Sequence, residues 1–303
     1  MSRVAAIDCG TNSIRLLIAD ISEGNFREID RRMEIVRLGQ GVDRNKSFHP
    51  DAIARTLAAV TEFATQITRR GVSKIRFCAT SATRDASNRS IFIEGVKKIL
   101  GVEPEVISGD EEARLSFLGA TRELHDADSP FLVVDIGGGS TEFVSGIRSV
   151  ETAKSVNIGC VRMSERHLTS QPPAKDQVEE AIIDIDRAIS DAATTVPLKA
   201  RTLVAVAGTA TTVAAAALNL DAYDRYSIHL SRIPATKVHE VSSRFLRMNR
   251  DEIASLGYMH PGRVDVIAAG ALVLDRIMIA TGASEFVASE SDILDGIAWS
   301  LAE

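Results

Sequence analysis

Residues 4–18 read VAAIDCGTNSIRLLI, an apolar run, a short polar turn and a second apolar run. Such runs around a cluster of turn-forming residues predict a strand, a tight turn and a second strand. The pattern returns at residues 131–145 as FLVVDIGGGSTEFVS. In both copies an Asp ends the first apolar run, at Asp8 and Asp135, and a Gly follows two residues later. This internal repeat predicts an α/β protein with two related domains that face one another across a cleft.

The remainder of the chain alternates helix and strand patterns. After the first repeat, strands are expected at 26–36, 74–79 and 105–107, and helices from 50 to about 70, near 90–100 and from 110. After the second repeat, helices are expected at 176–193, 264–279 and 292–301, and strands at 202–206 and 285–288. The polar stretch at 124–130 gives the best domain boundary, so the predicted domains are 1–126 and 127–303, with the option that the final helix packs back on the first.

Composition narrows the class of protein. The chain has 303 residues, a formal net charge of −6 and only 5% aromatic residues, which does not suit a nucleic-acid binder. Charged residues interrupt the first twenty positions, and no apolar stretch is long enough to span a bilayer. The three cysteines form no CxxC pair, so neither a disulfide framework nor a zinc site is expected. We expect a cytoplasmic protein with no nucleic-acid or membrane partner.

Three short segments rich in glycine and hydroxyl residues follow predicted strands and are expected to be turns, at 10–13, 137–141 and 207–212. Glycine allows a ligand to approach the backbone closely, and successive N–H groups in a tight turn can bind an anion. A GxGxxG motif opening a helix and a GxxxxGK[ST] motif are both absent, which disfavours dinucleotide binding and a P-loop. The phosphate-binding candidates in these segments are Gly10, Thr11, Asn12, Ser13, Gly137, Gly138, Gly139, Ser140, Thr141, Gly208 and Thr209.

Several carboxylates lie close to these segments. Asp8, Asp135 and Glu142 are candidate Mg²⁺ ligands, since carboxylates at strand ends beside phosphate loops can hold the ion. The alternative is that Asp8 and Asp135 only cap their own turns. Residues 108–115 read SGDEEARL, with three consecutive acids at an expected helix start. These acids either complement the helix dipole on a solvated face, or one of them orients an attacking water, and spacing does not choose which.

Basic residues provide candidates for binding phosphate directly. Residues 80–85 read TSATRD and follow a predicted strand, so Arg84 lies where it can bind a phosphate with two parallel hydrogen bonds. Weaker candidates, chosen only by residue type, are Arg15, Arg37, Arg89 and Arg263.

Taken together, residues 5–17, 108–115, 134–143, 208–212 and 263–270 resemble the exopolyphosphatase/guanosine pentaphosphate phosphatase family. The resemblance implies the actin/Hsp70/sugar-kinase superfold, with ribonuclease H-like domains. It also implies that Glu112 is the catalytic base and that Asp135 and Glu142 organise Mg²⁺, with Mn²⁺ as an alternative metal. The turns at 10–13 and 137–141 would bind phosphate, and Arg84 would be a basic residue of the cleft.

Longer family members carry additional C-terminal helical domains, so this chain resembles the short, two-domain form. The expected activity is Mg²⁺-dependent hydrolysis of the terminal phosphate of inorganic polyphosphate, and guanosine pentaphosphate is the alternative substrate. The aromatic candidates for holding a guanine, chosen only by type, are Phe26, Phe48 and Tyr223. An ATP-dependent kinase of the same superfold and a non-enzymatic phosphate or nucleotide sensor are further alternatives. A homodimer is left open.

Overall fold

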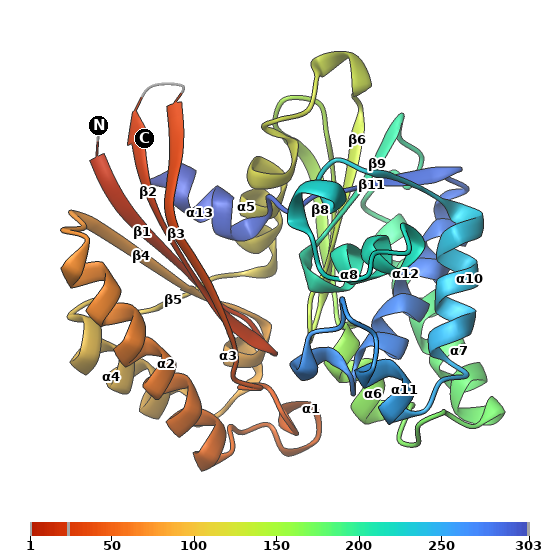
Figure 1. Ribbon diagram of the computed structural model, residues 1–303, viewed down its shortest axis with the longest axis horizontal. Coiled ribbons are helices and arrows are strands. Elements are labelled where there is room, and N and C mark those ends of the chain that lie inside the picture. The colour runs from red at the N-terminus through yellow and green to blue at the C-terminus, as the bar shows by residue number, and fades with distance from the viewer. Residues whose placement is uncertain (1, 23–24, 302–303) are drawn as a thin grey trace. The chain divides into compact units, whose positions relative to one another are not determined.

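The computed structural model describes residues 2–22 and 25–301, and the chain divides into two compact units (Figure 1). Unit 1 comprises Met1–Gly119 together with Ile293–Glu303, and unit 2 comprises Ala120–Asp292. The chain first passes from unit 1 to unit 2 in the last turn of α5 (Gly109–Thr121). This boundary lies shortly before the polar stretch in which it was expected. The final helix, α13 (Ile293–Ser300), belongs to unit 1.

Unit 1 contains a five-stranded sheet. Its strands are β1 (Ser2–Cys9), β2 (Ser13–Ser22), β3 (Asn25–Ile35), β4 (Lys74–Ala79) and β5 (Glu105–Val106). The spatial order is β3-β2-β1-β4-β5. The first three strands form antiparallel hairpins, whereas β4 and β5 run parallel to β1. The glycine turn at residues 10–13 therefore joins two central strands.

The two faces of this sheet bury alternate residues. Ala5 and Ile7 of β1 pack with side chains of α2 (Pro50–Arg69) and α4 (Arg89–Leu100). Val4 and Ala6 point to the other face, where α5 and α13 cover them. Because successive side chains of a strand point to opposite faces, a strand buried on both faces reads as a continuous apolar run, as β1 does.

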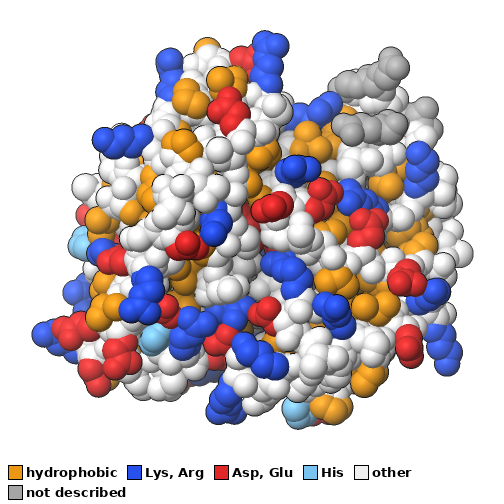
Figure 2. Space-filling model, turned by 180° about the vertical axis from the view of Figure 1, so that it is seen from behind, with side chains coloured by type: hydrophobic (Ala, Val, Ile, Leu, Met, Phe, Trp, Pro, Cys, Tyr) orange, Lys and Arg blue, Asp and Glu red, His pale blue; other side chains and the backbone are white. Residues whose placement is uncertain are grey.

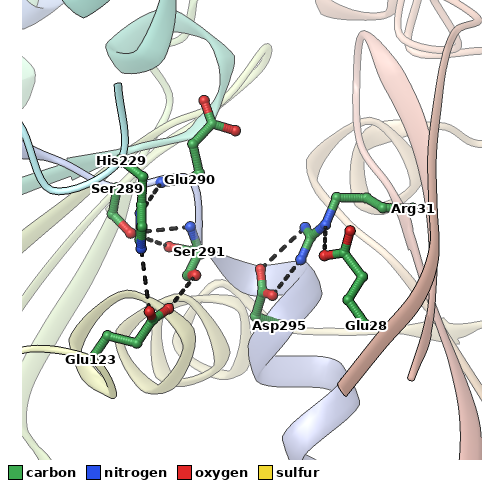
Figure 3. A network of polar contacts seen from close by, with 8 residues as sticks. All are labelled: Glu28, Arg31, Glu123, His229, Ser289, Glu290, Ser291 and Asp295. Carbon is green, nitrogen blue, oxygen red and sulfur yellow. Dashed lines mark hydrogen bonds and ion pairs between the residues drawn. The ribbon is translucent and has the colours of Figure 1, made fainter. Parts of the chain in front are cut away.

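An ion pair joins β3 and α13 within unit 1. Arg31 of β3 donates to the carboxylate of Asp295 and, at 2.8 Å, to that of Glu28 (Figure 3). The side chain of Asp295 is only 7% exposed. This pair ties the last helix of the chain to the edge strand of the first sheet.

Unit 2 contains a six-stranded sheet. Its strands are β6 (Phe131–Ile136), β7 (Thr141–Gly146), β8 (Val150–Val156), β9 (Thr202–Val206), β10 (Arg232–Pro234) and β11 (Glu285–Ala288). Read from β8, the order β8-β7-β6-β9-β11 repeats the order β3-β2-β1-β4-β5 of unit 1, with the same antiparallel and parallel pairings. The repeat in the sequence is thus a repeat of topology, and the expected α/β class is confirmed.

The longer helices of unit 2 pack into one core with β6, β7 and β9. They are α6 (Cys160–Arg166), α7 (Lys175–Ala193), α8 (Ala207–Ala217), α10 (Ala235–Phe245) and α12 (Ile267–Thr281). Residues 207–212, expected to be a turn, are instead the first half of α8, so that expectation is wrong. Ala207 has a φ of 67°, which turns the chain from β9 directly into the helix. Because this alanine-rich helix is almost wholly buried, it shows no amphipathic period.

Shorter helices complete the two units. They are α1 (Val42–Asn45) and α3 (Ser81–Asp85) in unit 1, and α9 (Arg225–Ile228), α11 (Arg250–Ala254) and the 3₁₀ turns Asp126–Asp128 and Pro261–Arg263 in unit 2. Across residues 2–22 and 25–301, every helix is too short or too polar to cross a membrane. Cys9, Cys78 and Cys160 are free thiols, and all three are buried.

Candidate active site

The acidic start of α5 places its three carboxylates in different surroundings. Asp110 is exposed, and Glu111 forms an ion pair with Arg76 at 3.1 Å. Glu112 is 8% exposed, and its Oε2 accepts a hydrogen bond from Nη1 of Arg84 at 2.7 Å. The helix begins here because the Oγ of Ser108 accepts a hydrogen bond from the N–H of Glu111. The structure therefore singles out Glu112 as the buried acid, which spacing alone did not do.

Burial raises the pKa of Glu112 above its ordinary value. The charge and the hydrogen bond of Arg84 lower this pKa, and so does a hydrogen bond with Thr80. The negative charge of Asp8 raises it. The net direction is upward, because removing the carboxylate from water disfavours its ionised form. A buried carboxylate with a raised pKa, held by an arginine, is suited to accepting a proton near neutral pH.

Arg84 lies in α3, directly after β4, as its place in the sequence predicted. Its Nη1 also donates to the carbonyl of Ile107 at 3.0 Å, which fixes the guanidinium beside Glu112. Among the described residues, no partner is found for its Nε and Nη2. These groups are available to a phosphate oxygen while Nη1 holds the carboxylate.

Asp8 has a cation as its immediate neighbour. Asp8 of β1 and Arg15 of β2 are directly opposed in the hairpin, and Nη2 and Nε of Arg15 lie 2.7 and 3.0 Å from Oδ2 of Asp8. The guanidinium neutralises the carboxylate, so Asp8 is a poorer metal ligand than expected from its position at a strand end. The sequence analysis chose Arg15 only by residue type, as a phosphate ligand, and did not predict its pairing with Asp8.

In unit 2 the corresponding position carries a second acid. Asp135 of β6 and Glu142 of β7 are directly opposed, and their side chains are 5% and 0% exposed. Oε1 of Glu142 accepts a hydrogen bond from Oγ of Ser155 on β8 at 2.7 Å. Two carboxylates on neighbouring strands fit Mg²⁺, which is commonly held by one or two carboxylates together with water and substrate oxygens. The described part of the chain contains no larger group of His, Cys, Asp and Glu able to hold a metal.

The glycine turn of unit 2 is held from one side by α6. The carbonyl of Gly137 accepts from the N–H of Cys160 at 3.0 Å, and that of Gly138 from the N–H of Val161 at 2.9 Å. Nε of Arg162 donates to the carbonyl of Gly139 at 2.6 Å. In a trans peptide the following N–H points opposite to the carbonyl, so the N–H groups of residues 138–140 point away from α6. Such a row of N–H groups can receive an anion.

The glycine turn of unit 1 has the same design with a different clamp. The carbonyl of Thr11 accepts from the N–H of Gly39 at 2.8 Å, and that of Asn12 from the N–H of Arg37 at 2.9 Å. The N–H groups of Asn12 and Ser13 therefore point away from the segment 36–39. In both turns the glycine N–H donates to a serine carbonyl, Gly10 to Ser13 at 2.9 Å and Gly137 to Ser140 at 3.0 Å. The two repeats thus share one hydrogen-bonding pattern.

The third segment lies at the start of α8 in unit 2. The guanidinium of Arg263 lies against Gly208, where a Cβ would come within 2.3 Å of Nη2. Nη1 of Arg263 donates to Oγ1 of Thr212 at 3.0 Å, and Thr212 in turn donates to the carbonyl of Gly208. Thr209 is 4% exposed and faces Gly270 of α12. Arg263 thus joins this segment, whereas Thr209 serves largely in packing between helices.

The predicted residues thus gather at one site in each unit. Unit 1 groups Asp8, the turn at 10–13, Arg84 and Glu112, and unit 2 groups Asp135, Glu142, the turn at 137–141 and the start of α8. Sequence reasoning missed Thr80, Ser155 and Arg162, which contact these residues. Thr80 had a signal, because it directly follows a predicted strand, but Ser155 and Arg162 lie in elements that no pattern had indicated.

Duplicated α/β units with glycine turns beside carboxylates are typical of enzymes that handle phosphate groups. The chain belongs to the Ppx/GppA phosphatase family, whose family model matches residues 17–302. The family resemblance found in the sequence is thereby confirmed.

Known relatives agree with this assignment over nearly the whole chain. The chain is 48% identical to exopolyphosphatase 2 of Mycobacterium tuberculosis, with 100% of this chain and 99% of that protein covered. The crystal structure of an exopolyphosphatase-like protein superposes with a TM-score of 0.96 at 44% identity, covering 99% of this chain and 98% of that one. The Ppx/GppA enzyme of Aquifex aeolicus superposes with a TM-score of 0.82 at 29% identity, covering 99% of both chains.

Proposed function

We propose that this chain is an exopolyphosphatase that hydrolyses the terminal phosphate of inorganic polyphosphate, with Glu112 as the general base. The observation that carries the proposal is the buried carboxylate of Glu112, held by Arg84 at 2.7 Å. The likeness to exopolyphosphatase 2 over the full length supports the choice of substrate.

In the proposed reaction, a water oxygen attacks the terminal phosphorus while the bridging P–O bond opposite to it breaks. The proton of the water passes to the carboxylate of Glu112, and the products are orthophosphate and a chain shorter by one unit. Assistance by a positioned base of this kind contributes about 10²–10⁴-fold. The raised pKa of Glu112 suits this role, because a stronger base accepts the proton more readily.

The other site residues would bind and orient the phosphate groups. Nε and Nη2 of Arg84 would contact terminal oxygens, and the N–H groups of the two glycine turns would receive further oxygens. Asp135 and Glu142 would hold Mg²⁺, or Mn²⁺ in its place, which when bound neutralises phosphate charge. Since phosphoryl transfer needs mainly positioning and charge stabilisation, these groups would supply most of the remaining catalysis.

The aromatic residues weigh against a guanine site. Phe48 is 2% exposed, and its ring centroid lies 6.0 Å from that of Phe92 in an edge-to-face arrangement. Phe26 packs against Trp299 with ring centroids 5.2 Å apart. The hydroxyl of Tyr223 donates to Glu290 at 2.6 Å and can accept from the hydroxyl of Thr211, 2.8 Å away. Packing thus occupies the rings of Phe26 and Phe48, which favours polyphosphate over guanosine pentaphosphate, and leaves Tyr223, which is 39% exposed, as the remaining candidate for stacking on guanine.

A test of the proposal compares phosphate release from polyphosphate, guanosine pentaphosphate and ATP, each with Mg²⁺ and without an acceptor. The proposal predicts release from polyphosphate with the highest kcat/KM. A higher kcat/KM for guanosine pentaphosphate would instead identify the chain as a guanosine pentaphosphate phosphatase. Absence of release from all three, with transfer from ATP to an acceptor, would instead support a kinase.

A further inference from the structure

The segment that follows β3 forms an open pocket of about 450 Å³ within unit 1. Cavities of this size commonly hold small ligands. It lies between α1, the start of α2 and the loop that joins them. Polar side chains of Gln40, Arg44, Asn45, His49, Asp51 and Arg55 line it together with the apolar Phe48 and Pro50.

The walls of this cavity, called here the α1–α2 pocket, are fixed by hydrogen bonds to the segment after α3. The N–H of Phe48 donates to Oδ1 of Asn88 at 2.8 Å, and Nδ2 of Asn88 donates to the carbonyl of Phe48 at 3.0 Å. The N–H and Oγ of Ser87 both donate to the carbonyl of Lys46 at 2.8 Å. The pocket is thus formed before any ligand binds, which lowers the entropic cost of binding.

The charges in the α1–α2 pocket are mainly positive. Nε of Arg55 donates to the carbonyl of Val36 at 3.1 Å, which leaves both terminal nitrogens to face solvent or a ligand. Within residues 2–22 and 25–301, no carboxylate pairs with Arg44 or Arg55. The one acid of the lining, Asp51, has a side chain that is 78% exposed and lies 3.6 Å from His49. Two guanidinium groups without carboxylate partners favour an anion with several oxygens.

The ring of His49 adds a hydrogen-bond donor. Its Nδ1 accepts from the N–H of Asp51 at 3.2 Å and caps α2. A neutral imidazole that accepts at one nitrogen carries its hydrogen on the other, so Nε2 is a donor. The lining therefore presents donors of three residue types, Arg, His and the amides of Gln40 and Asn45.

The α1–α2 pocket is connected to the glycine turn of the same unit through residue 39 of the chain. Gly39, whose N–H clamps the carbonyl of Thr11, directly precedes Gln40 in the lining. Gly39 packs so closely that a Cβ would lie 2.3 Å from Cγ2 of Thr11 and 3.1 Å from Cβ of Ala82 in α3. The same α3 carries Arg84. The pocket is thus attached through two short segments to the residues that would bind the terminal phosphate.

We propose that the α1–α2 pocket is a second anion subsite, which binds phosphate units of the polyphosphate chain behind the reacting end. This proposal rests on the proposed function. Basic and acidic side chains are interspersed over the face shown in Figure 2, and the net charge is −6, so a long polyanion needs local sites of this kind. A chain too short to reach the pocket gains nothing from it, so the pocket makes affinity depend on chain length.

The test uses the double variant Arg44→Gln/Arg55→Gln and steady-state kinetics with tripolyphosphate and with long-chain polyphosphate. Loss of two charge-assisted contacts is expected to raise KM for the long chain roughly tenfold or more. The kcat for both substrates and the KM for tripolyphosphate should stay within about twofold. The matched control is Arg69→Gln. Arg69 is exposed and lies in α2, roughly 20 Å along the helix from Arg55. If the arginines acted only by long-range attraction of the polyanion, Arg69→Gln would raise the KM for the long chain as well.

A binding measurement separates this proposal from the proposed function. Calorimetry with long-chain polyphosphate, and separately with orthophosphate, is done on full-length protein carrying Glu112→Gln, with and without the pocket substitutions. If the wild type releases no phosphate from polyphosphate, but long-chain binding is lost with the pocket arginines, the hydrolase is contradicted and the subsite is supported. Equal loss for both chain lengths, equal loss in Arg69→Gln, or loss of orthophosphate binding alone would overturn the subsite.

Discussion

Nη1 of Arg84 donates to Oε2 of Glu112 at 2.7 Å, and so joins a candidate phosphate ligand to the candidate base. The two residues come from α3 and α5, which follow neighbouring parallel strands of unit 1. The ends of such strands meet at one edge of a sheet, which explains why residues so far apart in the sequence meet here. Their pairing means that the charge of one controls the protonation of the other.

The first prediction concerns the pH dependence of kcat in Arg84→Met. Burial already raises the pKa of Glu112, and Arg84 counteracts that by favouring the ionised form. Without Arg84 the pKa rises further, so the carboxylate stays protonated and inactive up to a higher pH. The acidic limb of the kcat–pH profile should therefore move to higher pH. In Arg84→Lys, which keeps the charge, the limb should move less. An unmoved limb in the methionine variant would show that Arg84 does not control the base.

The second prediction concerns metal binding in unit 2. Asp135→Asn and Glu142→Gln should each weaken Mn²⁺ binding. The binding is measured by electron paramagnetic resonance in the absence of substrate. Ser155→Ala should weaken it roughly 10- to 100-fold, because the hydroxyl of Ser155 orients the carboxylate of Glu142 at 2.7 Å.

Asp8→Asn is the matched control for this measurement. Arg15 already neutralises Asp8, so metal affinity should change little, whereas breaking the largely buried pair should cost about 3 kcal/mol of unfolding free energy. If Asp8→Asn weakens Mn²⁺ binding as much as Asp135→Asn does, Asp8 takes part in metal binding in spite of its ion pair with Arg15.

The third prediction concerns the clamp on the glycine turn of unit 2. A Cβ at Gly159 would lie 2.5 Å from the carbonyl oxygen of Gly138 and 2.8 Å from that of Gly137. Because both are backbone atoms of the turn, Gly159→Ala should displace the turn, cost about 1–3 kcal/mol and raise KM for tripolyphosphate. Gly208→Ala meets the movable guanidinium of Arg263 and should be less destabilising. Urea unfolding and KM together test this, and an unchanged KM in Gly159→Ala would argue against phosphate binding by the turn.

The fourth prediction concerns acid stability. In unit 2, Glu123 lies 3.4 Å from Nε2 of His229 and accepts from Oγ of Ser291 at 2.9 Å (Figure 3). The hydrogen bond with His229, joined by that of Ser291, lowers the pKa of Glu123 to about 2. A lowered pKa stabilises the fold above the unfolded pKa of roughly 4.3, and this gain is lost as the pH falls toward 2.

Glu123→Gln should therefore reduce the free energy of unfolding at pH 7, by less than about 1 kcal/mol for so exposed a pair. The difference from wild type should shrink as the pH falls below 4.5. Denaturant titrations at several pH values measure it, and a difference that stays constant would contradict this origin of the pKa shift.

Much of the fold could be predicted from the sequence, because the two repeats are strong local patterns. The strands at 74–79, 202–206 and 285–288 match the observed β4, β9 and β11 at both ends. Helix α8 was missed because its side chains are buried all round, and periodicity detects only helices with one solvated face. Strand β8 and helices α6 and α10 also went unpredicted.

The site was predictable in its residues but not in its pairings. The acids at 110–112 are equivalent by spacing, and only burial and the ion pair with Arg84 distinguish Glu112. Likewise, Asp8 and Asp135 look alike in the sequence. They differ because the hairpin register places Arg15 opposite one and Glu142 opposite the other.

The central claim is that Glu112 is the base, and Glu112→Gln tests it most directly. Phosphate release from polyphosphate with Mg²⁺ is measured for wild type and variant, beside calorimetric binding of the same substrate. The kcat should fall about 10²–10⁴-fold with binding retained, because the amide keeps the shape of the side chain but cannot accept the proton. Near-normal turnover in Glu112→Gln would contradict the account.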